Sequence, residues 1–143
     1  MVMARQPDPQ HDNSDGPGLR VLVVEDDADL AAALAGWLGR LGHEARVAPD
    51  GPAALGAAEA CPPDVILLDI GLPGMDGYHV ARRVREEIVP ALPKAPLVIA
   101  VTGRGNEDDR RQSEAAGIDL HLTKPVDTVQ LLRVLRRFQD LIR

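Results

Sequence analysis

Charged and hydroxyl side chains recur in this chain directly after short apolar runs. The acids Glu25 and Asp26 follow residues 21–24, Asp69 follows 65–68, Thr102 follows 98–101 and Lys124 follows 120–123. If these side chains converge, the carboxylates repel one another unless a cation intervenes, and hard oxygen ligands with room for water suit Mg²⁺. A carboxylate beside such a cation is a competent nucleophile toward a phosphoryl group, whose oxygens a lysine and a hydroxyl can stabilise. These residue types therefore indicate phosphoryl transfer assisted by a divalent cation.

The element that must position Asp69 is a buried strand. The apolar run Val65–Leu68 is continuous and leads into the stretch 70–77, which is rich in Gly and Pro. This pattern is typical of a strand covered on both faces and followed by a loop. Ligands of open parallel sheets bind outside the carboxyl ends of the strands, so an acid at this end is placed for chemistry. An acid after one strand is a weak signal, whereas four such strand ends in one chain are a strong one.

The rest of the chain alternates strands with amphipathic helices. Strands are expected at 20–24, 44–47, 65–69, 97–101 and 119–122, and helices at 27–41, from 52 to about 60, at 76–87, at 106–116 and from about 127 onward. Asp27 is expected to cap the first helix rather than to bind a metal. This alternation predicts an α/β fold in which helices cover both faces of a parallel sheet.

One expected helix differs from the others. Between 106 and 116 charged residues predominate, so mainly Ala115 and Ala116 remain to pack against the core. Segments with few buried apolar contacts open and shift at a low cost in free energy. This helix is therefore the part that we expect to move.

The composition narrows the class of protein. A chain of 143 residues fits one domain, expected at 19–143, and the polar, Pro- and Gly-containing residues 1–18 are expected to form a disordered tail or linker. With 45% hydrophobic residues, no run long enough for a bilayer and no secretion signal, we expect a soluble, cytoplasmic protein without a membrane segment. A net charge of −6, from 16 basic and 22 acidic residues, argues against nucleic-acid binding. The single cysteine, Cys61, cannot form an internal disulfide.

The order of an acidic pair, Asp, Thr and Lys over residues 19–143 resembles the receiver domain of two-component response regulators, the CheY-like family. The resemblance implies a flavodoxin-like three-layer sandwich, with five parallel strands in the order 2-1-3-4-5 and five helices. It further implies that Asp69 takes a phosphoryl group from the phosphohistidine of a histidine kinase or a histidine phosphotransfer domain. Such a domain signals by switching a partner-binding face formed by the fourth helix, the fifth strand and the fifth helix. It is no turnover enzyme and assists only its own phosphorylation and dephosphorylation.

The resemblance also assigns roles at the site. Asp26 and Asp69 would ligate Mg²⁺ directly, Glu25 would act mainly through water, and the backbone carbonyl of Gly71 would complete the protein's share. Lys124 would pair with one phosphoryl oxygen, and the hydroxyl of Thr102 would contact another. The Lys124–Pro125 bond matches a family position at which the peptide is cis, and cis is expected here.

Two features depart from the commonest family pattern. Many receivers carry Tyr or Phe three positions before the lysine, where this chain has His121. A histidine can carry charge, so we expect its inward state to be favoured when neutral and opposed when protonated, which makes activation pH-sensitive near the unperturbed pKa of about 6.5. Two positions that flank the phosphoryl group in the family are Gly71, which leaves it open to water, and Arg104, which can shield or hold it.

Several settings and alternatives stay open at this point. A free-standing single-domain regulator is slightly favoured because the chain starts with Met and carries no output domain, and the oligomeric state expected is a monomer or weak dimer. A receiver module of a hybrid sensor histidine kinase is the alternative, since residues 1–18 resemble an interdomain linker. A haloacid dehalogenase-type phosphatase is disfavoured because it needs a second Asp where Gly71 stands. A pseudo-receiver that acts without phosphorylation is disfavoured because the acids and the lysine are all present.

Overall fold

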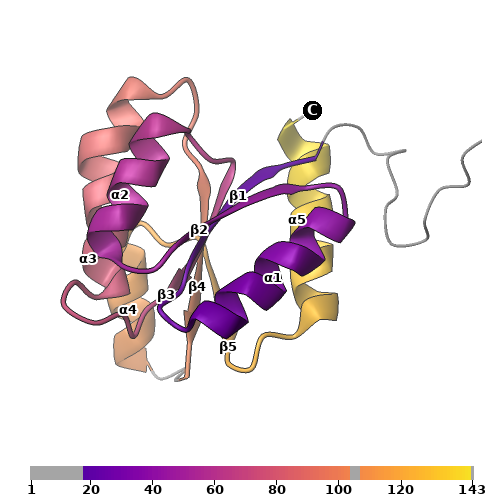
Figure 1. Ribbon diagram of the computed structural model, residues 1–143. Helices are drawn as coiled ribbons and strands as arrows, with labels where there is room; N and C mark the ends of the chain where they lie inside the picture. The colour runs from indigo at the N-terminus through magenta and orange to yellow at the C-terminus, as the bar shows by residue number, and fades with distance from the viewer. Residues whose placement is uncertain (1–17, 104–106, 143) are drawn as a thin grey trace, which may run out of the picture.

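The computed structural model describes residues 18–103 and 107–142. Within these ranges five strands alternate with five α-helices (Figure 1). The strands are β1 (Arg20–Val24), β2 (Glu44–Ala48), β3 (Val65–Asp69), β4 (Leu97–Thr102) and β5 (Leu120–Thr123), and the helices are α1 (Ala28–Arg40), α2 (Gly51–Ala60), α3 (Gly77–Arg83), α4 (Glu107–Ala116) and α5 (Thr128–Ile142). A π-helical turn, η2 (Val84–Ile88), and a 3-10 turn, η3 (Val89–Ala91), continue α3. The tail expected at 1–18 lies, apart from Gly18, outside the described residues.

The strands of the described chain form one parallel sheet in the order β2-β1-β3-β4-β5. The predicted strand order is therefore confirmed. Helices α1 and α5 cover one face of the sheet, and α2, α3 and α4 cover the other (Figure 1). β3 lies at the centre with all of its residues buried, so Asp69 ends the most protected strand.

Alternate residues of β1, β3 and β4 supply two hydrophobic cores, one on each face of the sheet. Leu22 and Ile66 pack on the side of α2 and α3, whereas Val23 and Leu67 pack on the side of α1 and α5. Full burial of a side chain of this size contributes about 1.5–3 kcal/mol. A slip of one residue in strand pairing would exchange the two faces, so both cores fix the register that brings the strand ends together.

Aspartates cap the helices that begin beside the carboxyl edge of the sheet. Oδ1 of Asp27 accepts hydrogen bonds from the N–H groups of Asp29 and Leu30, both at 3.1 Å, and Oδ1 of Asp76 accepts one from His79 N–H at 2.9 Å. Caps of this kind contribute about 1 kcal/mol each. The prediction that Asp27 is a cap is confirmed, and its carboxylate is engaged by the helix that it starts.

The helix expected at 76–87 is α-helical only from Gly77 to Arg83. The chain then widens into η2, in which Val89 N–H donates to Val84 O. Pro90 explains the change, because it cannot donate to Glu86 O and its ring would collide with that carbonyl in an α-helix.

The apolar pattern also misplaced some side chains. Leu141 follows the apolar spacing of Leu131 and Leu135 on α5, which would place it on the buried face, but it is 81% exposed at the end of that helix. On α4, Ala115 is exposed, and Ser113 is buried together with Ala116. A hydroxyl is compatible with this buried position because the Ser113 Oγ has a hydrogen-bonding partner on β5, His121.

Candidate functional site

The carboxylates of Glu25, Asp26 and Asp69 meet at the carboxyl edge of the sheet. β1 and β3 are neighbours with Val24 opposite Leu68, so the residues that follow these positions lie side by side. An oxygen from each of the three acids lies within 4.8 Å of the others. Glu25 is 6% exposed and Asp69 4%, whereas Asp26 is exposed to solvent. The fold thus brings together the acids that the sequence singled out.

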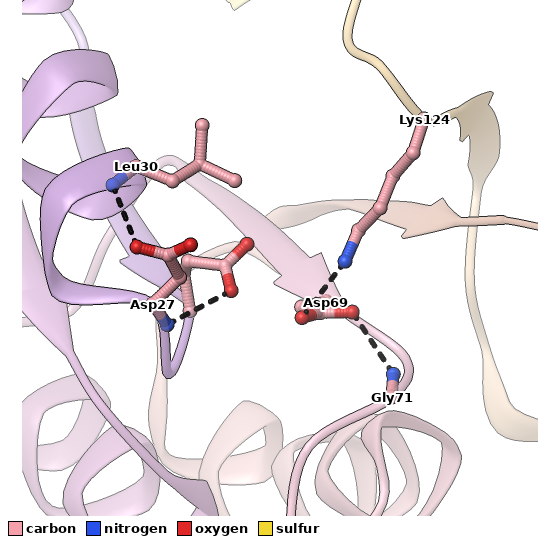
Figure 2. A network of polar contacts seen from close by, with 6 residues as sticks. Asp27, Leu30, Asp69, Gly71 and Lys124 are labelled. Atoms are coloured by element: carbon pink, nitrogen blue, oxygen red, sulfur yellow. Dashed lines mark hydrogen bonds and ion pairs between the residues drawn. The ribbon is translucent and has the colours of Figure 1, made fainter.

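Asp69 is held from two directions, as Figure 2 shows. Its Oδ1 accepts a hydrogen bond from Gly71 N–H at 2.9 Å, and its Oδ2 lies 3.1 Å from Nζ of Lys124. Contacts of a carboxylate with an N–H group and with an ammonium group are charge-assisted and short, and they offset part of the cost of burying the charge. The orientation of the Asp69 carboxylate therefore depends on the loop after β3 and on the end of β5.

Lys124 and Thr102 are brought to Asp69 by the pairing of β4 with β5. Thr102 lies opposite Thr123, and Lys124 N–H donates to Thr102 O at 2.8 Å. The Lys124–Pro125 peptide bond is cis, as expected. Thr102 is 8% exposed and lies in the wall of a cavity that Asp69 and Lys124 also line.

Glu25 differs from a solvent-exposed acid in its protonation. Burial raises the pKa of Glu25 to about 7; the hydrogen bond that its Oε2 accepts from Asp27 N–H at 3.1 Å acts in the opposite direction, and the neighbouring charge of Asp69 raises the pKa further. Near neutral pH the cluster therefore holds less negative charge than its three acids could carry. A bound cation reverses this balance, because it favours the ionised form of every carboxylate around it.

Two cavities flank the contact between Asp69 and Lys124. One, of about 510 Å³, is lined by both residues and by Ile70, Gly71, Tyr78, Thr102 and Gly103. The other, of about 360 Å³, lies on the side of α1 and has mainly apolar walls that include Leu30, Leu34 and Val126. The first cavity offers space for a small anion next to the carboxylate, the hydroxyl and the ammonium group. No sequence pattern marks Tyr78 as a residue of this cavity, since an aromatic residue at the start of a helix is common in cores.

Of the positions that depart from the family pattern, the structure describes His121 but not Arg104. His121 is half-buried on β5 opposite Ala100, and its Nε2 is hydrogen-bonded to Oγ of Ser113 on α4. This contact links the strand to the polar helix. Arg104 lies outside the described residues.

The donor set fits a hard divalent cation. Carboxylate oxygens from two adjacent strands converge, one of the acids is open to solvent, and water can complete the coordination. An arrangement of this kind suits Mg²⁺ better than Zn²⁺, which prefers nitrogen and sulfur ligands. The residues present therefore match the cation predicted from the sequence.

The chain belongs to the response regulator receiver domain family, which matches residues 21–136. It is a receiver domain of the two-component class. It is 39% identical over 126 residues to Response regulator PleD of Caulobacter vibrioides, an alignment that covers 86% of this chain and 27% of PleD. It is 36% identical over 120 residues to a 14.6 kDa protein of Leptolyngbya boryana, covering 82% of this chain and 88% of that protein. The chain thus spans about a quarter of PleD and most of the shorter relative.

Solved structures agree with this fold. The chemotaxis protein CheY4 of Vibrio cholerae superposes with a TM-score of 0.77 at 27% identity, covering 86% of this chain and 99% of that chain. The receiver domain of Ssk1 from Saccharomyces cerevisiae, crystallised with the histidine phosphotransfer protein Ypd1, gives a TM-score of 0.77 at 25% identity, covering 86% and 90%. The expected CheY-like fold is confirmed. Receiver domains bind Mg²⁺ at an acidic cluster, and Glu25, Asp26 and Asp69 form such a cluster here.

Among the described residues, none of the helices combines the length and the apolar character that crossing a bilayer requires.

Proposed function

We propose that Asp69 accepts a phosphoryl group from a phosphohistidine and that the domain, spanning residues 19–143, signals in this phosphorylated state. The observation that carries the proposal is the Asp69 carboxylate, nearly buried at the end of the central strand and held by Lys124 and by Gly71 N–H beside two further acids. In the transfer, a bond forms between an Asp69 oxygen and phosphorus while the bond from the donor's imidazole nitrogen to phosphorus breaks. The imidazole leaves with the electron pair and takes up a proton, so the donor histidine is regenerated.

Different residues of the chain would contact the phosphoryl group and the cation. Lys124, now paired with Asp69, would contact a phosphoryl oxygen once the carboxylate becomes an acyl phosphate, and the Thr102 hydroxyl would contact a second oxygen from the cavity wall. Mg²⁺ would be held directly by Asp26 and Asp69, through water by Glu25, and by the carbonyl of Gly71. When bound, the cation neutralises charge on the carboxylate and on the transferred group.

The partner that fits is a histidine kinase or a histidine phosphotransfer protein. The crystallised pair of Ypd1 with the Ssk1 receiver supports the second kind of partner.

The 14.6 kDa relative, of which the alignment covers 88%, supports a free-standing regulator, whereas the 27% coverage of PleD supports a module of a longer chain. A hybrid sensor kinase remains the alternative setting, and the output surface would be α4, β5 and α5.

The test is phosphorylation with a small phosphodonor. Wild-type protein incubated with acetyl phosphate and Mg²⁺ should gain the mass of one phosphoryl group. Asp69→Asn, which keeps the size of the side chain but removes the nucleophile, should gain none, and a chelator should abolish labelling of the wild type. A pseudo-receiver would show no labelling in any arm, and undiminished labelling of Asp69→Asn would refute the assignment.

A further inference from the structure

Gly77 touches the backbone of the phosphoacceptor itself. It is the first residue of α3 and is buried, and its N–H donates a hydrogen bond to Ile70 O at 3.0 Å. This bond closes the loop of residues 70–77, so the start of the helix lies against the residue that follows Asp69.

Space, and not conformation, requires glycine at this position. A Cβ on Gly77 would lie 2.7 Å from Ile70 Cα and 2.8 Å from Asp69 O, closer than real Cβ atoms come to such atoms. Both neighbours are backbone atoms, which cannot swing aside as a side chain does. Positive φ angles occur, among the described residues, only at Gly42, Gly74 and Gly117.

The segment that a Cβ would push has little freedom to yield. Ile70 N–H donates to Val101 O at 3.1 Å, which ties the residue after Asp69 to β4. One residue further on, Gly71 N–H is the donor that holds Oδ1 of Asp69 at 2.9 Å. Any displacement of this backbone therefore moves the donor that orients the carboxylate, and with it the Gly71 carbonyl that the proposed function assigns to Mg²⁺.

We propose that Gly77 is a positioning residue for the phosphoacceptor site: its bare Cα lets α3 seat against the Asp69 carbonyl and so sets the position of Gly71 relative to the Asp69 carboxylate. This inference rests on the proposed function, in which that carboxylate binds Mg²⁺ and attacks phosphorus. It assigns to Gly77 an effect on cation affinity and on transfer rate, exerted through the loop and without contact to either ligand.

The test is Gly77→Ala. Its apparent dissociation constant for Mg²⁺, measured by calorimetry, should rise by roughly 10- to 100-fold, the range found when groups that orient metal ligands are altered. Labelling by acetyl phosphate at saturating Mg²⁺ should slow by roughly 100-fold, as for a misplacement of about 1 Å. The amide resonance of Gly71 should shift in the folded, cation-free protein, because its hydrogen bond to Asp69 changes.

The matched control is Gly56→Ala. Gly56 lies in α2, where a Cβ would meet none of the described atoms within 4 Å, so cation affinity, labelling and the Gly71 resonance should stay at wild-type values. The inference is overturned if Gly77→Ala also keeps wild-type values, or if its labelling falls only in proportion to its folded fraction.

If Gly77→Ala does not fold, the substitution is made again in a protein stabilised by two other substitutions. Gly39→Ala and Gly56→Ala replace helix glycines whose Cβ positions are open, and each should favour folding by restricting the unfolded chain. If Gly77→Ala stays unfolded there too, the glycine serves folding and the inference fails. A wild-type protein that takes no phosphoryl group would refute the proposed function, while the Mg²⁺ affinity and the Gly71 resonance would still test Gly77.

Discussion

Lys124 controls how negative charge at the site is compensated. Its ammonium group lies 3.1 Å from Asp69 Oδ2, so it competes with a cation for that carboxylate. Lys124→Met keeps the length of the side chain without its charge and should tighten Mg²⁺ binding by roughly 5- to 30-fold, the equivalent of one or two kcal/mol. The same variant should slow labelling by acetyl phosphate by roughly 10²- to 10³-fold, because in the proposed function Lys124 is the positive partner of a phosphoryl oxygen. Calorimetry and intact mass measure the two effects.

Lys94→Met is the control for this pair of effects. Lys94 is exposed in the segment before β4, so the variant removes one positive charge from the surface and should alter neither quantity. Weaker Mg²⁺ binding in Lys124→Met would show that the lysine does not compete with the cation.

His43 gives the domain a pH dependence that is separate from the site. It is buried before β2, and its Nδ1 accepts a hydrogen bond from Leu19 N–H at 3.0 Å. Burial lowers the pKa of His43 below its usual value of 6.5. The folded protein therefore binds the proton less readily than the unfolded chain. The stabilisation is complete above about pH 6.5 and is lost as the pH falls toward the folded pKa.

Urea unfolding at several pH values tests this linkage. The free energy of unfolding should fall below about pH 6.5 by up to about 1.4 kcal/mol per pH unit from this residue. His43→Asn, whose side-chain oxygen can accept the same bond but does not titrate, should show a shallower slope. His79→Asn, at an exposed position of α3, should keep the wild-type slope. Equal slopes in all three proteins would exclude His43 as the cause.

At the scale of elements, two polar contacts join α4 to its neighbours, besides the burial of Ala116. Ser113 Oγ is hydrogen-bonded to Nε2 of His121 on β5, and Arg85 of η2 donates from Nη2 to Ala115 O at 2.9 Å. Loss of one such bond costs about 1 kcal/mol. Ser113→Ala and Arg85→Gln should therefore each raise hydrogen exchange of α4 amides about fivefold, with α1 amides unchanged. Arg82→Gln on α3 is the control, and unchanged α4 exchange in both variants would show that the contacts do not hold the helix.

The contact with Ser113 bears on the pH dependence expected for His121. A serine hydroxyl can donate to a neutral ring nitrogen and accept from a protonated one, so the bond is compatible with both charge states. The pH sensitivity of activation stays a prediction. Amide NMR with a beryllofluoride phosphoryl mimic, across pH values around 6.5, should show shifts in α4 and β5 that depend on pH in the wild type and not in His121→Phe. Thr102→Ala should reduce these shifts at every pH.

Sequence patterns predicted the elements better than the contacts between them. The strand order follows from a family resemblance, and the Asp27 cap follows from local rules, because both depend on residues close in the chain or on shared motifs. The close approach of Gly77 to Asp69 O and the hydrogen bond between Ser113 and His121 depend on how α3 and α4 pack against the sheet. No local sequence pattern encodes this packing. The π turn at Val84–Ile88 had a visible cause in Pro90, although the proline alone does not say how far back the helix will widen.

At the scale of the whole molecule, the cluster of Glu25, Asp26 and Asp69 opposes folding in the absence of a cation. Glu25 and Asp69 are buried close together, and the raised pKa of Glu25, about 7, reflects the cost of ionising it there. A cation that binds only the folded state stabilises that state, by about 2.7 kcal/mol at a concentration of 100 times its dissociation constant. For a chain of this size we expect Mg²⁺ at that concentration to raise the Tm by roughly 5–10 °C.

Glu25 and Asp26, which follow β1, should contribute unequally to the rise in Tm on adding Mg²⁺. Asp26→Ala should lose most of the Mg²⁺-dependent rise in Tm, and Glu25→Ala should lose less, since a directly bonded carboxylate contributes more than one acting through water. The shift on adding Mg²⁺ is the quantity to compare, because Glu25→Ala also removes the acceptor of Asp27 N–H and so changes the Tm in chelator. Glu59→Ala, at an exposed position of α2, should keep the full wild-type shift. If Glu25→Ala loses more of the shift than Asp26→Ala, Glu25 is the direct ligand and Asp26 acts through water.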